Sequence, residues 1–528
     1  MRRMIIGKSI NFNNRGYSNE HNINDSSGGF ISYNQSHLQM KSPTIANYLI
    51  PRMRDILFLI VFAAAMAAGW RTLNNDGDLP RHLLMGKLIV ETDSIPRQEM
   101  FSYIYEGRPY VAHEWLADVI FYLSYLALGF KGVVVLTALL IASAFFILYS
   151  VLSTEFEEWF LTLFFVLWGV ANTYPYWVAR PLLFSIFFLV LWLVLTDRIS
   201  RGGKVNLWIL PGIMVLWGNI HAEFVAGFLV LIAYIAGWFW GYYFDRENMD
   251  PGVIKKLAAV FGISLIASLI NPFGWHTWET ILRYMGNKYL MSTILETRPP
   301  DFSNPSLLVE FLLIITSILI LSFNKGKIRS GQAFLLAGFT ALAMISTRNM
   351  HLYGVVAPFV LVGPAVEILE PVIRKTGASA MGKIEKQLKG IVWPVAAVLV
   401  SIILLFSGIL GKDYLIDPKL FPVNAVQWLQ KNPQSGHMFN DFIWGGYIEW
   451  RLWPEQKDFI DSQSDLTGEA TKIYLSVINL GDGWQTVLEQ YDVQWVIIPV
   501  NSALSQELIK DGWSILYKDS TAVILRQE

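Results

Sequence analysis

The stretch from Gly132 to Leu152, GVVVLTALLIASAFFILYSVL, contains no charged residue. A helix of about 20 apolar residues crosses the roughly 30 Å of hydrocarbon in a bilayer. Similar runs recur along the chain, and about eleven are long enough to be spans. The predicted spans are 56–73, 132–152, 158–177, 181–197, 206–220, 223–243, 255–270, 306–323, 333–347, 353–369 and 391–410. The sequence therefore predicts a mainly α-helical, polytopic membrane protein.

The composition supports this class. Of the 528 residues, 53% are hydrophobic and only 16% are charged, whereas soluble domains carry about 25% charged residues. Too few polar side chains are left to cover a soluble fold. Lys+Arg (41) and Asp+Glu (42) nearly cancel, which argues against a nucleic-acid partner because such proteins carry a basic excess. The chain has no cysteine, so disulfides, thiolate metal sites and a cysteine nucleophile are excluded.

Charge in the loops predicts the orientation. The loops 198–205, 324–331 and 370–390 are basic, whereas three loops on the opposite side, 176–180, 221–222 and 348–352, hold at most one basic residue each. Basic loops face the cytoplasm. The N-terminus is therefore expected on the cytoplasmic side of the cell membrane and the C-terminus on the outer side. The apolar segment 115–129 is short and interrupted by Asp118. We expect it to lie in the membrane interface as an amphipathic helix, since a further span would turn every later basic loop outward.

Three regions follow from this pattern. Residues 1–54 are polar and predict a disordered cytoplasmic tail, the alternative being a chain that starts at Met53. Residues 55–410 form the transmembrane domain, with a long first outer loop at 74–131. Residues 411–528 predict a small extracytoplasmic α/β domain. Its predicted strands are 437–440, 457–461, 493–499, 513–518 and 521–526, and its predicted helices are 422–431, 466–479, 483–490 and 501–510.

The unusual polar residues gather on the predicted outer side. They are Asp76, Asp78, His82, His113, Glu114, Arg180, His221, Glu223, Glu296, Arg348 and His351. Each has an ordinary interpretation, such as a solvated turn, an arginine reaching lipid head groups or a hydrogen-bonded pair at a helix end. Ionisable groups at membrane depth usually face a cavity, however, and chance would place them on both sides. Acids beside arginines suit a site where a carboxylate deprotonates an acceptor while cations hold a phosphate leaving group.

Three short motifs resemble the GT-C superfamily of membrane glycosyltransferases, which includes the catalytic subunit of oligosaccharyltransferase and the protein mannosyltransferases. Asp76-Gly77-Asp78 opens the long first outer loop, as acidic residues do in that superfamily. Thr293-Ile294-Leu295-Glu296 fits the T-I-x-E motif of the oligosaccharyltransferase subunit, and Trp444-Gly445-Gly446-Tyr447 is loosely similar to its W-W-D-Y-G motif. Ile443, Trp444 and Gly445 stand in place of the Trp-Trp-Asp that reads an asparagine sequon, so a sequon acceptor is not expected.

This resemblance implies a GT-C-like fold and an inverting transfer of sugar from a polyprenyl-phosphate donor to a glycan, lipid or protein acceptor outside the cell. It implies that Asp76 is the base, with Asp78 as the second choice, and that Arg180 and Arg348 neutralise the lipid phosphate. The residues expected to line the substrate cavity are His82, His113, Glu114, His221, Glu223, Glu296 and His351. Asp76, Asp78 and Glu296 would hold Mg²⁺ or Mn²⁺ if the enzyme uses a metal.

Two alternatives remain open. A transporter of lipid-linked glycans, or a non-catalytic assembly protein, would also bind membrane lipids, but a transporter typically has polar residues at mid-bilayer and inverted repeats. In the C-terminal domain, acceptor contact is one interpretation and a tight Gly-Gly turn with aromatics packed in a small domain or at the interface is the other. The candidates for acceptor contact are Asp441, Trp444, Tyr447, Asp461 and Asp465.

Overall fold

The computed structural model describes residues 49–244, 249–324, 328–376, 388, 390, 392–407, 414–462 and 468–528. Most of the predicted tail 1–54 lies outside these residues, as does Asp465. The described residues belong to one compact unit, Ile45–Glu528.

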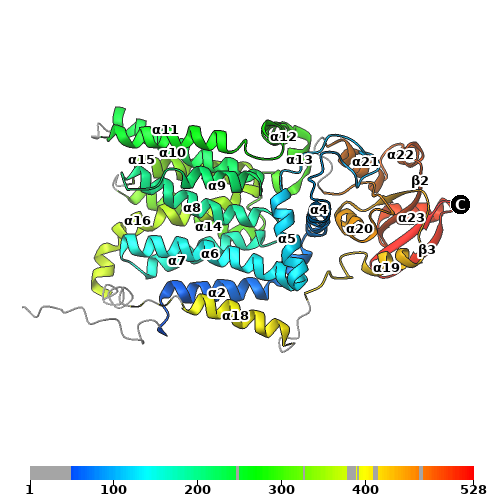
Figure 1. Cartoon of the computed structure of the whole chain (residues 1–528), viewed down its shortest axis with the longest axis horizontal. Coiled ribbons are helices and arrows are strands. Elements are labelled where there is room, and N and C mark those ends of the chain that lie inside the picture. Colours follow the sequence, from blue (N-terminus) through cyan, green and yellow to red (C-terminus); the bar gives the residue numbers. More distant parts are fainter. Residues whose placement is uncertain are drawn as a thin grey trace, which may run out of the picture. The chain divides into compact units, whose positions relative to one another are not determined.

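Each predicted span contains a helix, and the helices lie along one another as a bundle (Figure 1). They are α2 (Met53–Ala67), α6 (Phe130–Phe156), α7 (Phe160–Thr173), α8 (Leu182–Ser200), α9 (Ile209–Gly218), α10 (Val225–Tyr243), α11 (Pro251–Ala267), α14 (Leu308–Phe323), α15 (Ser330–Ile345), α16 (Met350–Thr376) and α18 (Val392–Phe406). Among the described residues, five helical segments are long and apolar enough to cross a membrane: those of α6, α8, α10, α14 and α16. The chain is thus a multi-pass membrane protein, and the number eleven stays a prediction.

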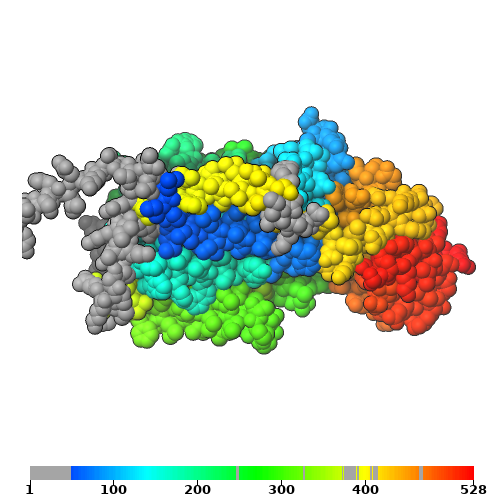
Figure 2. Space-filling view, turned by 90° about the horizontal axis from the view of Figure 1, so that it is seen from below, coloured from blue at the N-terminus to red at the C-terminus, as the bar shows by residue number. Residues whose placement is uncertain are grey.

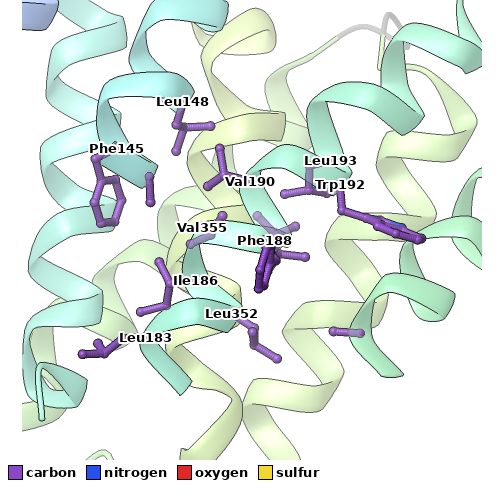
Figure 3. Packing of buried hydrophobic residues seen from close by; sticks show 14 of the residues in the cluster. Phe145, Leu148, Leu183, Ile186, Phe188, Val190, Trp192, Leu193, Leu352 and Val355 are labelled. Atoms are coloured by element: carbon purple, nitrogen blue, oxygen red, sulfur yellow. The ribbon is translucent and has the colours of Figure 1, made fainter. Parts of the chain in front are cut away.

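The middle of the bundle consists of helices that are apolar on all sides. Phe145 and Leu148 of α6 lie close to Ile186 and Val190 of α8 and to Val355 of α16 (Figure 3). The apolar segment of α16 is 78% buried, whereas that of α14 is only 22% buried. Since a helix hydrophobic all round must bury every face, α16 belongs to the interior, and the exposed side chains of α14 are suited to lipid.

Helices at the edges of the bundle differ in detail from the predicted spans or run across them. The predicted span 56–73 is two helices, α2 and the short α3 (Gly69–Asn74), and the hydroxyl of Tyr414 donates a 2.8 Å hydrogen bond to the Met66 carbonyl at this break. Helix α18 lies along α2, as both views show (Figures 1 and 2). Segment 115–129 forms α5 (Trp115–Leu128), which runs across the end of the bundle and packs on α6 and on α4 (Asp78–Thr92) (Figure 1). This placement fits an interface helix.

The connections on the same side as α4 are short helices. They are η1 (Tyr174–Tyr176), η2 (Ala222–Phe224), α12 (Trp275–Gly286), α13 (Lys288–Thr293), η3 (Leu295–Thr297), η4 (Pro305–Leu307) and η5 (Thr347–Asn349). Polar residues that cannot continue an apolar helix are therefore collected at one end of the bundle, next to α4 and α5.

The C-terminal domain contains a four-stranded mixed sheet of order β1-β2-β4-β3. Strands β1 and β2 are parallel, and the other two pairs are antiparallel. Its elements are α19 (Val423–Lys431), β1 (His437–Asn440), η6 (Phe442–Trp444), α20 (Gly445–Leu452), α21 (Glu469–Ile478), α22 (Trp484–Gln490), β2 (Val493–Pro499), α23 (Ala503–Lys510), β3 (Ser514–Lys518) and β4 (Ala522–Arg526).

Two expectations for this domain were wrong. Segment 457–461 is not a strand, because it makes one isolated bridge, between Asp458 and Ser102, and the Asn440 side chain takes up neighbouring backbone groups at Phe459 and Ile460. The Gly445-Gly446 pair is not a tight turn but the first turn of α20. Contacts with distant parts of the chain decide both outcomes. Asp458 pairs with Ser102, and Gly446 packs against the Gly77 carbonyl group.

Helix α20 packs directly on the Asp76–Asp78 turn. A Cβ added to Gly77 would lie 2.0 Å from the Ile443 carbonyl oxygen, and one added to Gly446 would lie 2.8 Å from the Gly77 carbonyl oxygen. Both glycines are required by this close approach of two backbones. The hydroxyl of Ser462 also donates a hydrogen bond to Asp78. The C-terminal domain thus holds the first outer loop.

We expect Gly77→Ala to lower the apparent melting temperature of the detergent-solubilised protein. The added methyl group meets backbone atoms that cannot move independently, and overpacking of this kind costs about 1–3 kcal/mol. The control is Gly262→Ala, in α11, where a Cβ meets nothing within 4 Å and alanine favours the helix. Equal melting temperatures for Gly77→Ala and the wild type would contradict the close packing of the two backbones.

Candidate active site

One arginine joins three carboxylates from distant parts of the chain. The guanidinium of Arg180 lies 2.9 Å from Asp76 (Nε–Oδ2), 2.6 Å from Asp78 (Nη2–Oδ2) and 3.1 Å from Glu296 (Nη1–Oε1). We call these four residues the Arg180 cluster. Arg180 and Asp76 each keep about one fifth of their side-chain surface exposed (19% and 20%), so the cluster is accessible to a ligand.

Local structure explains why these side chains meet. Asp78 starts α4, and its N–H donates a 3.0 Å hydrogen bond to the Asp76 side chain, which closes a tight turn. Arg180 precedes α8, and the neighbouring Ala179 N–H donates to the Thr72 carbonyl. Glu296 lies in η3, where its carbonyl accepts a 3.0 Å hydrogen bond from the Ser346 hydroxyl. Each charged side chain is thus fixed at the end of an apolar helix or in the turn next to one.

The two aspartates differ in pKa. Burial raises the pKa of Asp76 to about 6, and Arg180 only partly opposes this. Burial also opposes ionisation of Asp78, but Arg180, His82 and the hydrogen bond from Ser462 together lower the pKa of Asp78 below its ordinary value. Asp76 is therefore the carboxylate that can exchange a proton near neutral pH.

A second group of ionisable residues lies beside the first. Its closest contacts are those of His351 Nε2 with Glu223 Oε2 at 3.1 Å and of His221 with Glu223 and Glu114 at 3.4 Å and 3.5 Å. His113 Nε2 lies 3.8 Å from Glu114 Oε1. We call these five residues the histidine–glutamate cluster. The His221 ring also contacts the Ser185 hydroxyl at 2.9 Å.

Two further cations stand near both groups. His82 Nδ1 lies 2.6 Å from Asp118 Oδ1; burial opposes the charge, but this hydrogen bond and the Asp118 charge raise the pKa of His82 to about 9, so it is an imidazolium at neutral pH. Arg348 interacts electrostatically with Glu296, Glu223 and Arg180. The one hydrogen bond that described residues give its side chain is a 3.4 Å contact to the Tyr284 hydroxyl, so its donors are available.

An apolar cavity of about 430 Å³ opens beside the histidine–glutamate cluster. It is lined by Trp115, Leu116, Val215, Leu216, Asn219, Ile270, Asn271 and Pro272. Trp115 directly follows Glu114, and Asn219 comes two residues before His221, so the backbone links two of the lining residues to the histidine–glutamate cluster. Its lining suits a hydrocarbon chain whose polar end reaches the charged groups.

The structure brings all eleven predicted site residues to this end of the bundle, in two clusters bridged by His82 and Arg348. Asp118, Ser185 and Ser462 are partners of the site that were not predicted from the sequence. Asp118 carries a signal in the sequence, because a charge inside an apolar segment indicates a buried partner as well as an interrupted span. Ser185 and Ser462 gave none, because a single serine in an apolar helix or a loop is ordinary.

The residues predicted to contact the acceptor in the C-terminal domain are engaged in contacts within the protein. The side chains of Trp444 and Tyr447 are buried in its core (4% exposed each), so they cannot stack on a sugar. Asp441 caps η6 through the Ile443 N–H and accepts from the Tyr474 hydroxyl. Asp461 is fully buried and bonded to Arg81. These four residues hold the domain together.

The acids that the sequence offered as metal ligands do not fit a metal in this arrangement. Asp76, Asp78 and Glu296 all point at the Arg180 guanidinium, which takes the central position that an ion would need. A guanidinium offers five N–H donors to surrounding carboxylates. Arg180 is therefore the resident cation of this cluster.

Comparison with known proteins identifies the fold. No protein-family model matches the sequence, and no curated protein matches it. Among solved structures, the archaeal oligosaccharyltransferase AglB from Archaeoglobus fulgidus, in complex with an inhibitory peptide and a dolichol-phosphate, has a TM-score of 0.57 at 12% identity, over 84% of this chain and 69% of that chain. An Archaeoglobus fulgidus oligosaccharyltransferase tethered to an acceptor peptide with the NVT sequon has a TM-score of 0.53 at 11% identity, over 89% of this chain and 74% of that one.

The chain has the fold of an oligosaccharyltransferase. The predicted distant resemblance to the GT-C superfamily is thus confirmed as a likeness of fold, although sequence identity is low. The likeness of fold extends over more than four fifths of this chain.

Arg180→Gln is expected to destabilise the protein above about pH 6. Removing the guanidinium leaves three neighbouring carboxylates uncompensated, at a cost of at most about 3 kcal/mol because the cluster is partly exposed. Protonation of the acids relieves the repulsion, so the difference in melting temperature between the variant and the wild type should shrink as pH falls from 8 to 5. A difference that does not change with pH would contradict this role of Arg180.

Proposed function

We propose that this protein is a membrane glycosyltransferase that transfers a sugar from a polyprenyl-phosphate-linked donor to an acceptor on the extracytoplasmic face of the cell membrane. The observation that carries the proposal is the convergence of a titratable carboxylate, Asp76, and an available cation, Arg348, at the end of an apolar bundle. A base and a cation so placed are what displacement of a lipid phosphate requires.

Asp76 acts as the base. It removes the proton from the acceptor nucleophile as that atom attacks the anomeric carbon, and the bond to the donor phosphate breaks on the opposite side, which inverts the configuration. The raised pKa of Asp76, about 6, matches a base that works near neutral pH. Asp78 stays ionised and holds Arg180 with Glu296.

Arg348 neutralises the departing lipid phosphate, assisted by the imidazolium of His82. Arg180 was an equal candidate on sequence, but its guanidinium is already bonded to three carboxylates. Its role is to position Asp76 and Asp78. In the histidine–glutamate cluster, Glu223 and Glu114 orient His221 and His351, which offer N–H donors to the sugar or phosphate.

The apolar cavity bounded by Trp115 and Ile270 accommodates the first isoprene units of the donor. Fold likeness supports this, because the Archaeoglobus fulgidus structure of the same fold contains a dolichol-phosphate. That structure and its tethered counterpart also hold peptides. The acceptor class here is a glycan, a lipid or a protein, and the buried Trp444 and Tyr447 leave no exposed aromatic pair at the place of a sequon reader.

Asp76→Asn is expected to reduce transfer at least about 1,000-fold, because an amide cannot accept the acceptor proton. Binding of the polyprenyl-phosphate donor should change little, since Arg348, His82 and the apolar cavity are retained. Transfer is measured in reconstituted vesicles with radiolabelled polyprenyl-phosphate sugars, alongside Asp511→Asn as a control on an exposed aspartate of the C-terminal domain. Full activity in Asp76→Asn would refute the assignment.

The pH dependence of transfer distinguishes the two aspartates. A base must be ionised, so activity is present above the pKa of the base and is lost as pH falls through it. Asp76 predicts an acidic limb near pH 6, whereas Asp78, whose pKa is lowered, would give no limb above about pH 4. The measurement is the profile of kcat/KM between pH 4.5 and 8. A flat profile would exclude Asp76 as the base.

A further inference from the structure

A third charged cluster lies between the first outer loop and the C-terminal domain, and the proposed reaction does not use it. Arg81, on α4, is fully buried and bonds to Glu449 at 2.8 Å, Asp461 at 3.1 Å and Glu99 at 3.3 Å. Asp458 stands beside them, since carboxylate oxygens of Glu449, Asp458 and Asp461 all lie within 4.8 Å of one another. We call these five residues the Arg81 cluster.

In the part of the chain that the structure describes, the Arg81 cluster has more negative than positive charge. Four carboxylates share one guanidinium among the described residues, and all five side chains are buried. Glu99 is well compensated, because its Oε1 accepts hydrogen bonds from the backbone N–H groups of Met100, Phe101 and Ser102. Glu449 and Asp461 share Arg81. Burying further negative charge without a partner is strongly unfavourable.

Among the described residues, no donor group bonds to the Asp458 carboxylate, which faces the carboxylates of Glu449 and Asp461. Its side chain is 0% exposed, and within the described part of the chain neither of its carboxylate oxygens accepts a hydrogen bond. Its backbone is held in place, because its N–H donates to the Phe101 carbonyl at 3.1 Å and its carbonyl accepts from the Tyr103 N–H at 3.1 Å. The carboxylate therefore cannot turn away to water. Native buried polar groups nearly always have a partner.

We infer that Glu449, Asp458 and Asp461 bind one hard divalent cation, Ca²⁺ or Mg²⁺. Three carboxylates whose oxygens lie close together supply the ligands that such ions prefer, and the ion supplies the charge and the partner that Asp458 lacks. The site is distinct from the Arg180 cluster, where a guanidinium already holds the central position. Its ligands come from α20 and the 458–461 segment.

The role of this ion is to fasten the C-terminal domain to the first outer loop. Arg81 lies on α4, close in sequence to Asp78, and the ion's ligands Glu449 and Asp461 are its partners. The next residue, Ser462, donates a hydrogen bond to Asp78. Loss of the ion would thus loosen the turn that carries Asp76 without removing any group from the site.

The test is metal content and thermal stability of the full-length protein in detergent. After treatment with EDTA and desalting, 1 mM CaCl₂ or MgCl₂ is added in separate arms, and the ion that binds should raise the apparent melting temperature by at least about 3 °C. Mass spectrometry of the desalted, reloaded protein should find about one equivalent of that ion. Asp458→Asn, which keeps the shape and removes the charge, should lose both effects.

Two controls keep the result interpretable. Glu507→Gln removes a half-exposed acid of the same domain and should keep the ion and the shift, as should Asp76→Asn in the Arg180 cluster. If Asp458→Asn does not fold, Asp461→Asn, which keeps the link between Arg81 and Glu449, is assayed for bound metal in its place.

Three outcomes would overturn the proposal. One is no bound metal and no shift with either ion in the wild type. Another is metal retained by Asp458→Asn and lost by Asp76→Asn, which would place the ion at the Arg180 cluster. The third is an ion that binds to the wild type without changing its melting temperature, which would contradict its role in fastening the C-terminal domain to the first outer loop.

Discussion

The ion pairs of Arg180 are the interaction on which the arrangement of this end of the molecule depends. Arg180 precedes α8, Asp76 and Asp78 lie at the start of α4, and Glu296 lies in η3, more than 100 residues further along the chain. Three elements that pack separately in the bundle are thereby fixed to one another by a single guanidinium. Like charges as close as these carboxylates would otherwise repel one another in a medium of low dielectric constant.

The C-terminal domain is part of this charged end of the bundle, because it contacts the Asp76–Asp78 turn directly. Gly77 and Gly446 let the Asp76–Asp78 turn and α20 approach until backbone meets backbone. The hydroxyl of Ser462 and the guanidinium of Arg81 then join the loop to the domain through buried polar contacts. A proton acceptor in this turn therefore has a position set by two domains, which is the preorganisation that catalysis needs.

Much of this was readable from the sequence. Apolar runs fixed where helices form, so the polar residues that interrupt them, such as His221 and Arg348, had to lie at helix ends, and charge asymmetry placed those ends together. Which of these polar residues pair with one another could not be predicted from the sequence. Whether Arg180 meets a phosphate or three carboxylates depends on how α4, α8 and η3 pack, and Asp78 and Ser462 are 384 positions apart. Helix α20 was missed because two glycines disfavour a helix locally, while the close approach to Gly77 requires them.

Exposure separates the roles of the two arginine clusters. Arg81 and Glu449 are fully buried, and the Arg81 guanidinium also lies 4.0 Å from the centre of the Phe101 ring, so no ligand larger than an ion reaches it without opening the domain. Arg180 makes equally short contacts, yet about one fifth of its side chain and of Asp76 faces outward. A substrate can therefore compete for the partners of Arg180 but not for those of Arg81. The two clusters thus differ in access to solvent rather than in the strength of their ion pairs.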